Sequence, residues 1–158
     1  MKRYLLALVL LALVLSTALV GCQTAPKVDW ELQITGAVNH PLTLSYRDLV
    51  KRDQVTLENI LMQRSKGEDT TNTWVGPALK PILEEAGISS NATAVICSAS
   101  DGYAKKVPLE DAYKAIIALK KDGEWIASRD KGPIRIVIPG RPANFWVAQL
   151  IEIKVVEE

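Results

Sequence analysis

The stretch that decides the fold is GPIRIVIPGRPANFWVAQLIEI, residues 132–153 of the 158-residue chain. Its apolar run from Ile134 to Ile138 carries a single charge, Arg135, and predicts a buried strand. Pro139-Gly140 must end that strand, because proline cannot continue the ladder and glycine turns the chain. Alternation from Leu150 to Val156 predicts a second strand. Two strands joined by a Pro/Gly loop can form one wall of a pocket.

The loop between these strands holds three candidate pocket residues. Arg141-Pro142-Ala143-Asn144 is stiffened by its proline, and Phe145 and Trp146 close it. The two rings offer flat apolar surface, which either lines a ligand pocket or fills the core. We take Asn144, Phe145 and Trp146 as candidate ligand-contacting residues, and packing in the core is the alternative for both rings.

The first residues resemble a bacterial lipoprotein signal. Met1-Lys2-Arg3 is basic, residues 4–18 are almost wholly apolar, and Leu19-Val20-Gly21 precedes Cys22, as in a lipobox. That resemblance implies cleavage before Cys22, acylation of this cysteine, and stable anchoring through several acyl chains. The alternative is an uncleaved signal anchor, because the apolar run is close to the length that a spanning helix needs.

The chain therefore divides into a lipoprotein signal peptide (1–21), a lipidated Cys22 with a short tether (22–29), and one domain (30–158). We expect an exported protein, anchored by lipid to a membrane of the cell envelope, with its domain outside the cytoplasm. Cleavage removes two of the 19 bases and none of the 18 acids, so the mature chain is nearly neutral. Without a basic patch, nothing favours a nucleic-acid partner.

The hydrophobic pattern favours a single α+β domain, a mixed β-sheet with short packed helices. Helices are expected at Tyr46–Lys51, from Pro77 to a stop at Gly87, and, as the longest, from Pro108 through Ile117. Ser45 and Asp48 form a capping-box pattern at the first of them. Strands are expected at 30–34, 55–62, 94–97 and 105–107, with a polar loop at 63–72 and a hairpin turn at Asp122-Gly123.

Few residues suit catalysis. His40 is the sole histidine and lies in an Asn-His-Pro turn, so we assign no catalytic residue and no metal ligand. Cys97 lies within an apolar run and should behave as a small hydrophobe, and Glu110-Asp111 should lie on a solvated helix face. The segment 101–103 follows a buried strand, so Asp101 and Tyr103 either form a pocket rim or a plain turn.

Five segments, in order, resemble the small single-domain form of the sulfite-oxidase type of molybdopterin-binding oxidoreductase domain. They lie at residues 34–49, 74–87, 100–109, 132–140 and 145–153, and together they cover nearly all of 30–156. The resemblance implies a mixed α+β fold with a cleft for molybdenum held by a pyranopterin dithiolene. It also marks Tyr103 as the family's pocket tyrosine and Arg135 as a recurring strand arginine.

The chain departs from this family at the metal. The resemblance implies a molybdenum-ligating cysteine in the loop after strand 55–62, where this chain has Met62-Gln63-Arg64-Ser65. A soft metal centre favours a thiolate there. An arginine and a lysine expected after Pro139-Gly140 are matched by Phe145 and Ala148.

These departures favour an accessory module whose former cofactor cleft binds another small ligand or an envelope protein. Bound molybdopterin is not expected, and the short basic region, which lacks twin arginines, points the same way because it suggests export of an unfolded chain. The alternatives are a functional molybdopterin-dependent oxidoreductase or electron-transfer component, and a purely structural envelope protein.

Overall fold

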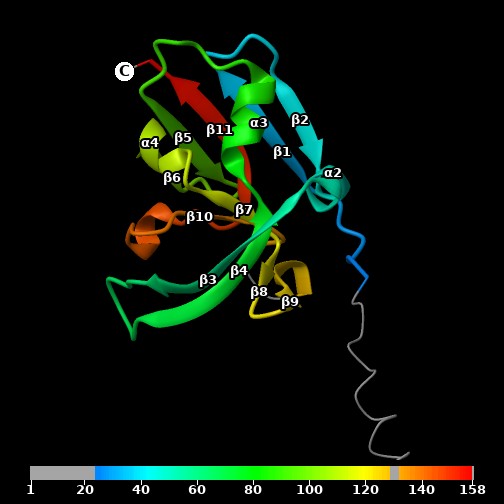
Figure 1. Ribbon diagram of the computed structural model, residues 1–158, viewed down its shortest axis with the longest axis vertical. Helices are drawn as coiled ribbons and strands as arrows, with labels where there is room; N and C mark the ends of the chain where they lie inside the picture. Colours follow the sequence, from blue (N-terminus) through cyan, green and yellow to red (C-terminus); the bar gives the residue numbers. More distant parts are fainter. Residues whose placement is uncertain (1–23, 129–131, 158) are drawn as a thin grey trace, which may run out of the picture.

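The computed structural model describes residues 24–128 and 132–157, and it has the expected α+β architecture of mixed sheets with short helices (Figure 1). The main sheet has the strand order β2-β1-β11-β5-β6. Its strands are β1 (Glu31–Gly36), β2 (Leu42–Ser45), β5 (Ala94–Ala99), β6 (Ala104–Pro108) and β11 (Leu150–Val156). The last strand of the chain, β11, pairs in parallel with β1 and antiparallel with β5, so it lies at the centre of the sheet.

A second sheet carries a long hairpin that reaches away from the main sheet (Figure 1). It consists of β3 (Gln54–Met62), β4 (Thr70–Pro77), β8 (Lys120–Lys121) and β9 (Glu124–Trp125). The β3–β4 register shifts between Leu57 and Ile60, where Asn59 has a positive φ of 53°, and such a bulge bends a strand. A separate pair joins β7 (Ile116–Ala118) to β10 (Arg135–Val137).

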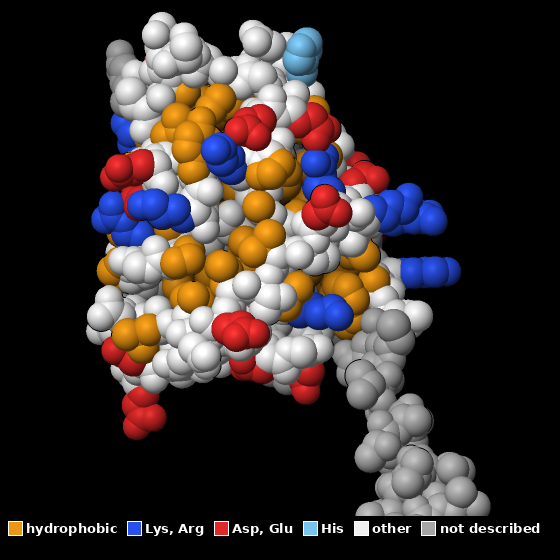
Figure 2. All heavy atoms as spheres, viewed as in Figure 1, with side chains coloured by type: hydrophobic (Ala, Val, Ile, Leu, Met, Phe, Trp, Pro, Cys, Tyr) orange, Lys and Arg blue, Asp and Glu red, His pale blue; other side chains and the backbone are white. Residues whose placement is uncertain are grey.

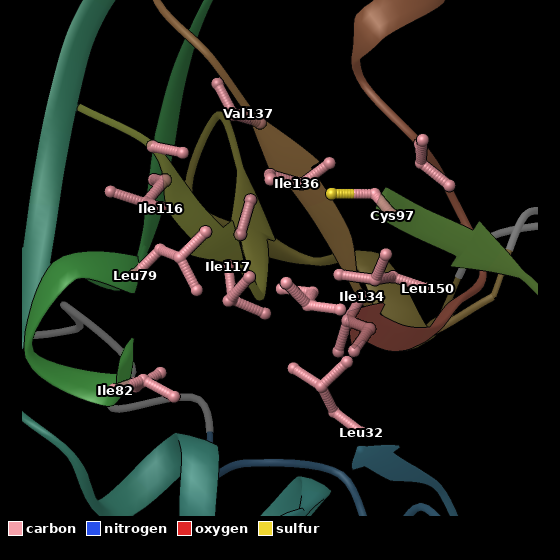
Figure 3. Packing of buried hydrophobic residues seen from close by; sticks show 14 of the residues in the cluster. Leu32, Leu79, Ile82, Cys97, Ile116, Ile117, Ile134, Ile136, Val137 and Leu150 are labelled. Atoms are coloured by element: carbon pink, nitrogen blue, oxygen red, sulfur yellow. The ribbon is translucent and has the colours of Figure 1, made fainter. Parts of the chain in front are cut away.

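The helices are short: α2 (Tyr46–Lys51), α3 (Leu79–Ala86), α4 (Leu109–Ala112) and the 3₁₀ turns η1 (Ile126–Ser128) and η2 (Ala143–Phe145). Buried side chains from α3, β7, β10 and the main sheet form one core (Figure 3). Among the described residues, every side chain in or against this core lies between Val28 and Val155.

Several local predictions are confirmed. Ser45 caps α2, its Oγ accepting from the Asp48 backbone while the Asp48 carboxylate accepts from the Ser45 N–H, which completes a capping box. Gly87 ends α3 in the left-handed conformation, with φ 65°. Asp122 and Gly123, both with positive φ, form the turn between β8 and β9.

The long helix expected from Pro108 is wrong. Only Leu109–Ala112 is helical, and Ile116–Ala118 forms β7, paired with β10 and fully buried. A short apolar run at helical spacing fits a buried strand equally well, and here the partner strand β10 decides.

The solvated position expected for Asp111 is also wrong. Its side chain is buried, and it accepts from Arg141 Nε at 2.7 Å as part of an ion pair.

The polar loop expected at 63–72 is shorter, because β4 begins at Thr70. The signal peptide and Cys22 lie outside the described residues. Within 24–128 and 132–157, no helix is long and apolar enough to cross a membrane.

Candidate ligand cleft

Two hollows adjoin at Arg135 and Trp146, and together we name them the cleft. The first, about 460 Å³, lies between the end of the β3–β4 hairpin and loop 139–146, and the second, about 340 Å³, lies beside the β5–β6 turn. The first is lined by Met62, Arg64, Ser65, Lys66, Arg135, Ala143, Asn144 and Trp146. The second is lined by Ala99, Asp101, Tyr103, Arg135, Trp146, Val147, Ala148 and Gln149.

The cleft exists because the hairpin end meets the loop after β10. The Ala143 N–H donates to the Gln63 carbonyl at 2.8 Å, which ties η2 to the last residues of the hairpin. Trp146 Nε1 donates to the carbonyls of Ile138 and Arg141, both at 3.0 Å, and closes the Pro/Gly loop from inside. The Trp146 ring meets Trp74 edge to face, with centroids 5.8 Å apart. Trp146 is thus both a core residue and a cleft wall.

The β5–β6 turn reaches the same loop through Tyr103. Its hydroxyl donates to the Asn144 carbonyl at 2.6 Å, and its backbone N–H donates to Asp101 Oδ1 at 3.0 Å. Tyr103 is 45% exposed, so part of it is open to solvent. The sequence predicted a pocket rim or a plain turn at 101–103, and the structure places a turn that lies on the rim.

Arg135 is the electrostatic centre of the cleft. It lies on β10, opposite Ala118 and bridged to Ala148, and it lines both hollows. Its guanidinium lies 5.8 Å from the Trp74 ring, but within the described chain it has no carboxylate partner or hydrogen bond. Burial, and then repulsion from Arg64, lowers the pKa of Arg135. A half-buried cation beside another cation, without a paired acid, favours a bound anion.

Two further cations, which the sequence analysis did not predict, add to the positive charge of the cleft. Arg64 and Lys66, in the hairpin end, line the first hollow with Arg135. In the sequence, residues 63–66 stand out only for the missing cysteine. Their nearness to loop 139–146 depends on a contact between segments that are separated by about half the chain, and no local pattern in the sequence contains that contact.

Phe145 is the one candidate residue that lines neither hollow. Two cations lie over its ring, with Lys105 Nζ 4.3 Å and Arg141 Cζ 5.5 Å from the centroid. Arg141 in turn forms an ion pair with Asp111 of α4, and this pair ties loop 139–146 to that helix. Ala148 lines the second hollow and brings no charge. The other five candidates, Asp101, Tyr103, Arg135, Asn144 and Trp146, all line the cleft.

The donor set of the cleft does not fit molybdenum held by a protein thiolate. Cys97 is fully buried on β5, its sulfur points toward Ile136 inside the core (Figure 3), and burial raises its pKa to about 12. In residues 24–128 and 132–157, no three His, Cys, Asp or Glu side chains form a group that could hold a metal. The cations of the cleft fit an anionic group.

Comparisons with known proteins identify the architecture. Residues 20–158 match the family described as "Oxidoreductase molybdopterin binding domain". The "Uncharacterized oxidoreductase YuiH" of Bacillus subtilis is 30% identical over 119 residues, which are 74% of this chain and 59% of that protein. "Nitrate reductase [NADH]" of Volvox carteri is 27% identical over 84% of this chain and 20% of its own length.

The sulfane dehydrogenase SoxCD of Paracoccus pantotrophus has the same fold. Its structure superposes with a TM-score of 0.76 at 20% identity, over 85% of this chain and 40% of that one. This match confirms the expected sulfite-oxidase-like fold class. The chain spans about three fifths of the Bacillus relative, and a smaller share of the other two proteins.

Proposed function

The chain belongs to the oxidoreductase molybdopterin-binding domain family, and we propose that it uses the family's cleft as an anion-binding module on an exported, lipid-anchored protein. The module acts as an accessory component in the cell envelope and binds an anionic small molecule through Arg135, Arg64 and Lys66. Tyr103 and Asn144 form the open rim of this site, and Trp146 forms its inner wall.

The observation that carries the proposal is the unpaired charge of Arg135. A guanidinium in this position costs free energy in the unliganded protein, because burial weakens its hydration and Arg64 repels it. An anion in the first hollow relieves both effects and is reached by three cations. Charge-assisted hydrogen bonds to a bound anion contribute about 1.5–3 kcal/mol each.

A redox enzyme is the second candidate, favoured by the family and by the names of the relatives. It requires molybdopterin to be held through its pterin and phosphate, with metal coordination that no cysteine of the cleft provides. Cations suit a phosphate in either case. What separates the two candidates is whether metal and pterin are present in stoichiometric amounts.

Anion binding is tested by titrating the protein with sulfate, inorganic phosphate and phenyl phosphate while recording tryptophan fluorescence, since Trp146 lines the cleft and Trp74 packs against it. We expect saturable quenching or enhancement that weakens at least about tenfold in Arg135→Gln, from the loss of one or two charge-assisted bonds. Lys114→Gln, which removes an exposed cation that lines neither hollow, is the matched control. Equal affinities for both variants, or no saturable signal with any of the three anions, would contradict the proposal.

The anchor has its own test. We expect the mature protein isolated from bacterial membranes to begin at Cys22 and to carry acyl chains, visible by mass spectrometry of its N-terminal peptide. A chain that retains residues 1–21 would contradict the anchor and leave the anion site unaffected.

A further inference from the structure

A hollow of about 910 Å³, larger than either half of the cleft, lies at the base of the domain between the tether and α2. Four of its lining residues are apolar: Ala25, Pro26, Val28 and Val50. The residue that follows the tether is fixed in the domain, because the Tyr46 N–H donates to the Trp30 carbonyl at 2.8 Å and Trp30 Nε1 donates to the Leu150 carbonyl at 2.8 Å. Within the tether, Val28 packs against the core, which places this end of the tether beside the domain.

Three cations line this hollow: Lys27, Arg47 and Lys51. All three are exposed, and none forms an ion pair or a side-chain hydrogen bond within the described residues. Arg47 and Lys51 are four residues apart, so they lie on one face of α2. Asp29 is the one acid that lines the hollow, and Asp48 is engaged in the capping box with Ser45. The hollow thus carries an excess of positive charge.

Tyr46 is one of the residues that line the same hollow, and its hydroxyl has no partner within the described chain. The Tyr46 side chain is 1% exposed, and its hydroxyl has no hydrogen-bond partner among the described residues. Burial raises the pKa of Tyr46 to about 12, so the hydroxyl stays protonated and able to donate. An unsatisfied buried donor costs free energy, but this hydroxyl is closed to solvent, so the three cations are the groups that a ligand in the hollow can reach.

The position of the hollow indicates what occupies it. Ala25 is three residues from Cys22, so the hollow lies within about 10 Å of the acylated residue along the chain. In Figure 1, α2 and the tether lie on the right, while the hairpin end and β10 lie on the left. Figure 2 shows basic side chains that project on the right-hand side, where Figure 1 places α2.

From these observations we propose that the hollow receives the phosphate headgroup of an anionic phospholipid, and that this contact seats the α2 face on the membrane. The inference rests on the lipid anchor of the proposed function and adds an orientation to it. Lys27, Arg47 and Lys51 surround the phosphate, and the apolar lining residues contact the upper acyl region. With α2 on the membrane, the cleft on the opposite side opens to the aqueous compartment.

The experiment measures how the membrane protects the lysines of the hollow. The mature lipidated protein is reconstituted in vesicles of phosphatidylcholine alone, or of phosphatidylcholine and phosphatidylglycerol in equal parts. Mass spectrometry then follows the rate at which a water-soluble reagent acylates Lys27, Lys51 and, as the reference, Lys114. We expect phosphatidylglycerol to slow Lys27 and Lys51 about fivefold relative to Lys114, and salt to reverse the effect.

Two controls test whether the lipid headgroup in this hollow causes the protection. Arg47→Glu should abolish most of the protection, while Lys114→Glu should leave that of Lys27 and Lys51 intact. Glycerol 3-phosphate added to phosphatidylcholine vesicles should give no protection. Equal rates on both vesicles, or full protection by the soluble phosphate, would overturn the proposal.

Failure of the anchor is distinguishable from failure of this contact. An N-terminal peptide without acyl chains shows that Cys22 is not lipidated. The same vesicles mixed with the unacylated protein then still decide whether Lys27 and Lys51 contact an anionic surface.

Discussion

The main sheet and the β3–β4 hairpin are both built from β-strands, but they have different roles in the molecule. In β11, the central strand of the main sheet, Leu150, Ile153 and Val155 are buried, whereas along β3 only Met62 is. The sheet therefore supplies the core, while the hairpin stands away from it and brings Arg64 and Lys66 to the cleft. Stability should depend on the first region, whereas the second should contribute two of the three cations that bind the ligand.

The largest expected effect tests the main sheet. Ile153→Ala removes a fully buried side chain from β11 and should lower the free energy of unfolding by about 2–5 kcal/mol. Ile151→Ala, in the same strand but 38% exposed, should cost less than about 1 kcal/mol. Urea denaturation of both variants measures the contrast. Similar midpoints would mean that β11 does not lie at the centre of the core.

The next effect concerns the support of the cleft loop. Asp111→Asn breaks the ion pair that holds Arg141 beneath Phe145, and should cost about 2 kcal/mol, less than a fully buried pair because Arg141 is partly exposed. Glu85→Gln breaks the more exposed pair with Arg52 and should cost less than about 1 kcal/mol. If the two variants unfold at the same denaturant concentration, the Asp111 pair does not fix the loop.

Alkaline pH should weaken the main sheet and its packing against α2. Burial raises the pKa of Cys97 from its ordinary 9.0, and that of Tyr46 from 10.0, to about 12 in each case. Both groups stay protonated in the folded chain and ionise in the unfolded one, so their contribution is complete below pH 9 and is lost as pH rises toward 12. Each lowers stability by about 1.4 kcal/mol per pH unit within its window.

Thermal unfolding across pH 8–12 measures this slope, and Cys97→Ala isolates one of the two groups. The variant should be less stable at neutral pH and should show a shallower alkaline decline. An unchanged decline would show that the Cys97 thiol does not cause it.

The smallest effect has the opposite sign and belongs to the cleft. Arg135→Met replaces an unpaired, half-buried cation by an apolar side chain of similar length, and should raise the stability of the unliganded protein by about 1 kcal/mol. The same variant should lose anion binding. A loss of stability would show that Arg135 is retained for the fold, because its contacts would then outweigh its desolvation.

Local sequence signals predicted the parts of the fold that local chemistry determines. The capping box at Ser45, the stop at Gly87 and the turn at Asp122-Gly123 each depend on neighbouring residues, and each formed as expected. Ile116–Ala118 was misread as helix because its conformation is decided by β10, which is distant in sequence. Asp111 was misread for the same reason, since its partner Arg141 lies thirty residues away.

The candidate site shows the same division. Tyr103, Asn144 and Trp146 were found because a turn and a Pro/Gly loop are visible locally, and Arg135 was found through the family resemblance. Arg64 and Lys66 were missed because only the long hairpin brings them to that loop. Phe145 was predicted together with Trp146 as an aromatic pair that closes the loop, but it lines neither hollow, and Lys105 lies over its ring.

The proposed function requires that the family's cleft is retained without thiolate-held molybdenum and binds an anion instead. The decisive experiment expresses residues 23–158 in a cytoplasm that makes molybdopterin, then measures molybdenum by elemental mass spectrometry and pterin by fluorescence after acid release. We expect a folded protein with far less than one molybdenum and one pterin per chain. Near one of each per chain, both lost in Arg135→Gln but not in Lys114→Gln, would contradict the proposed function and establish a cofactor-loaded oxidoreductase.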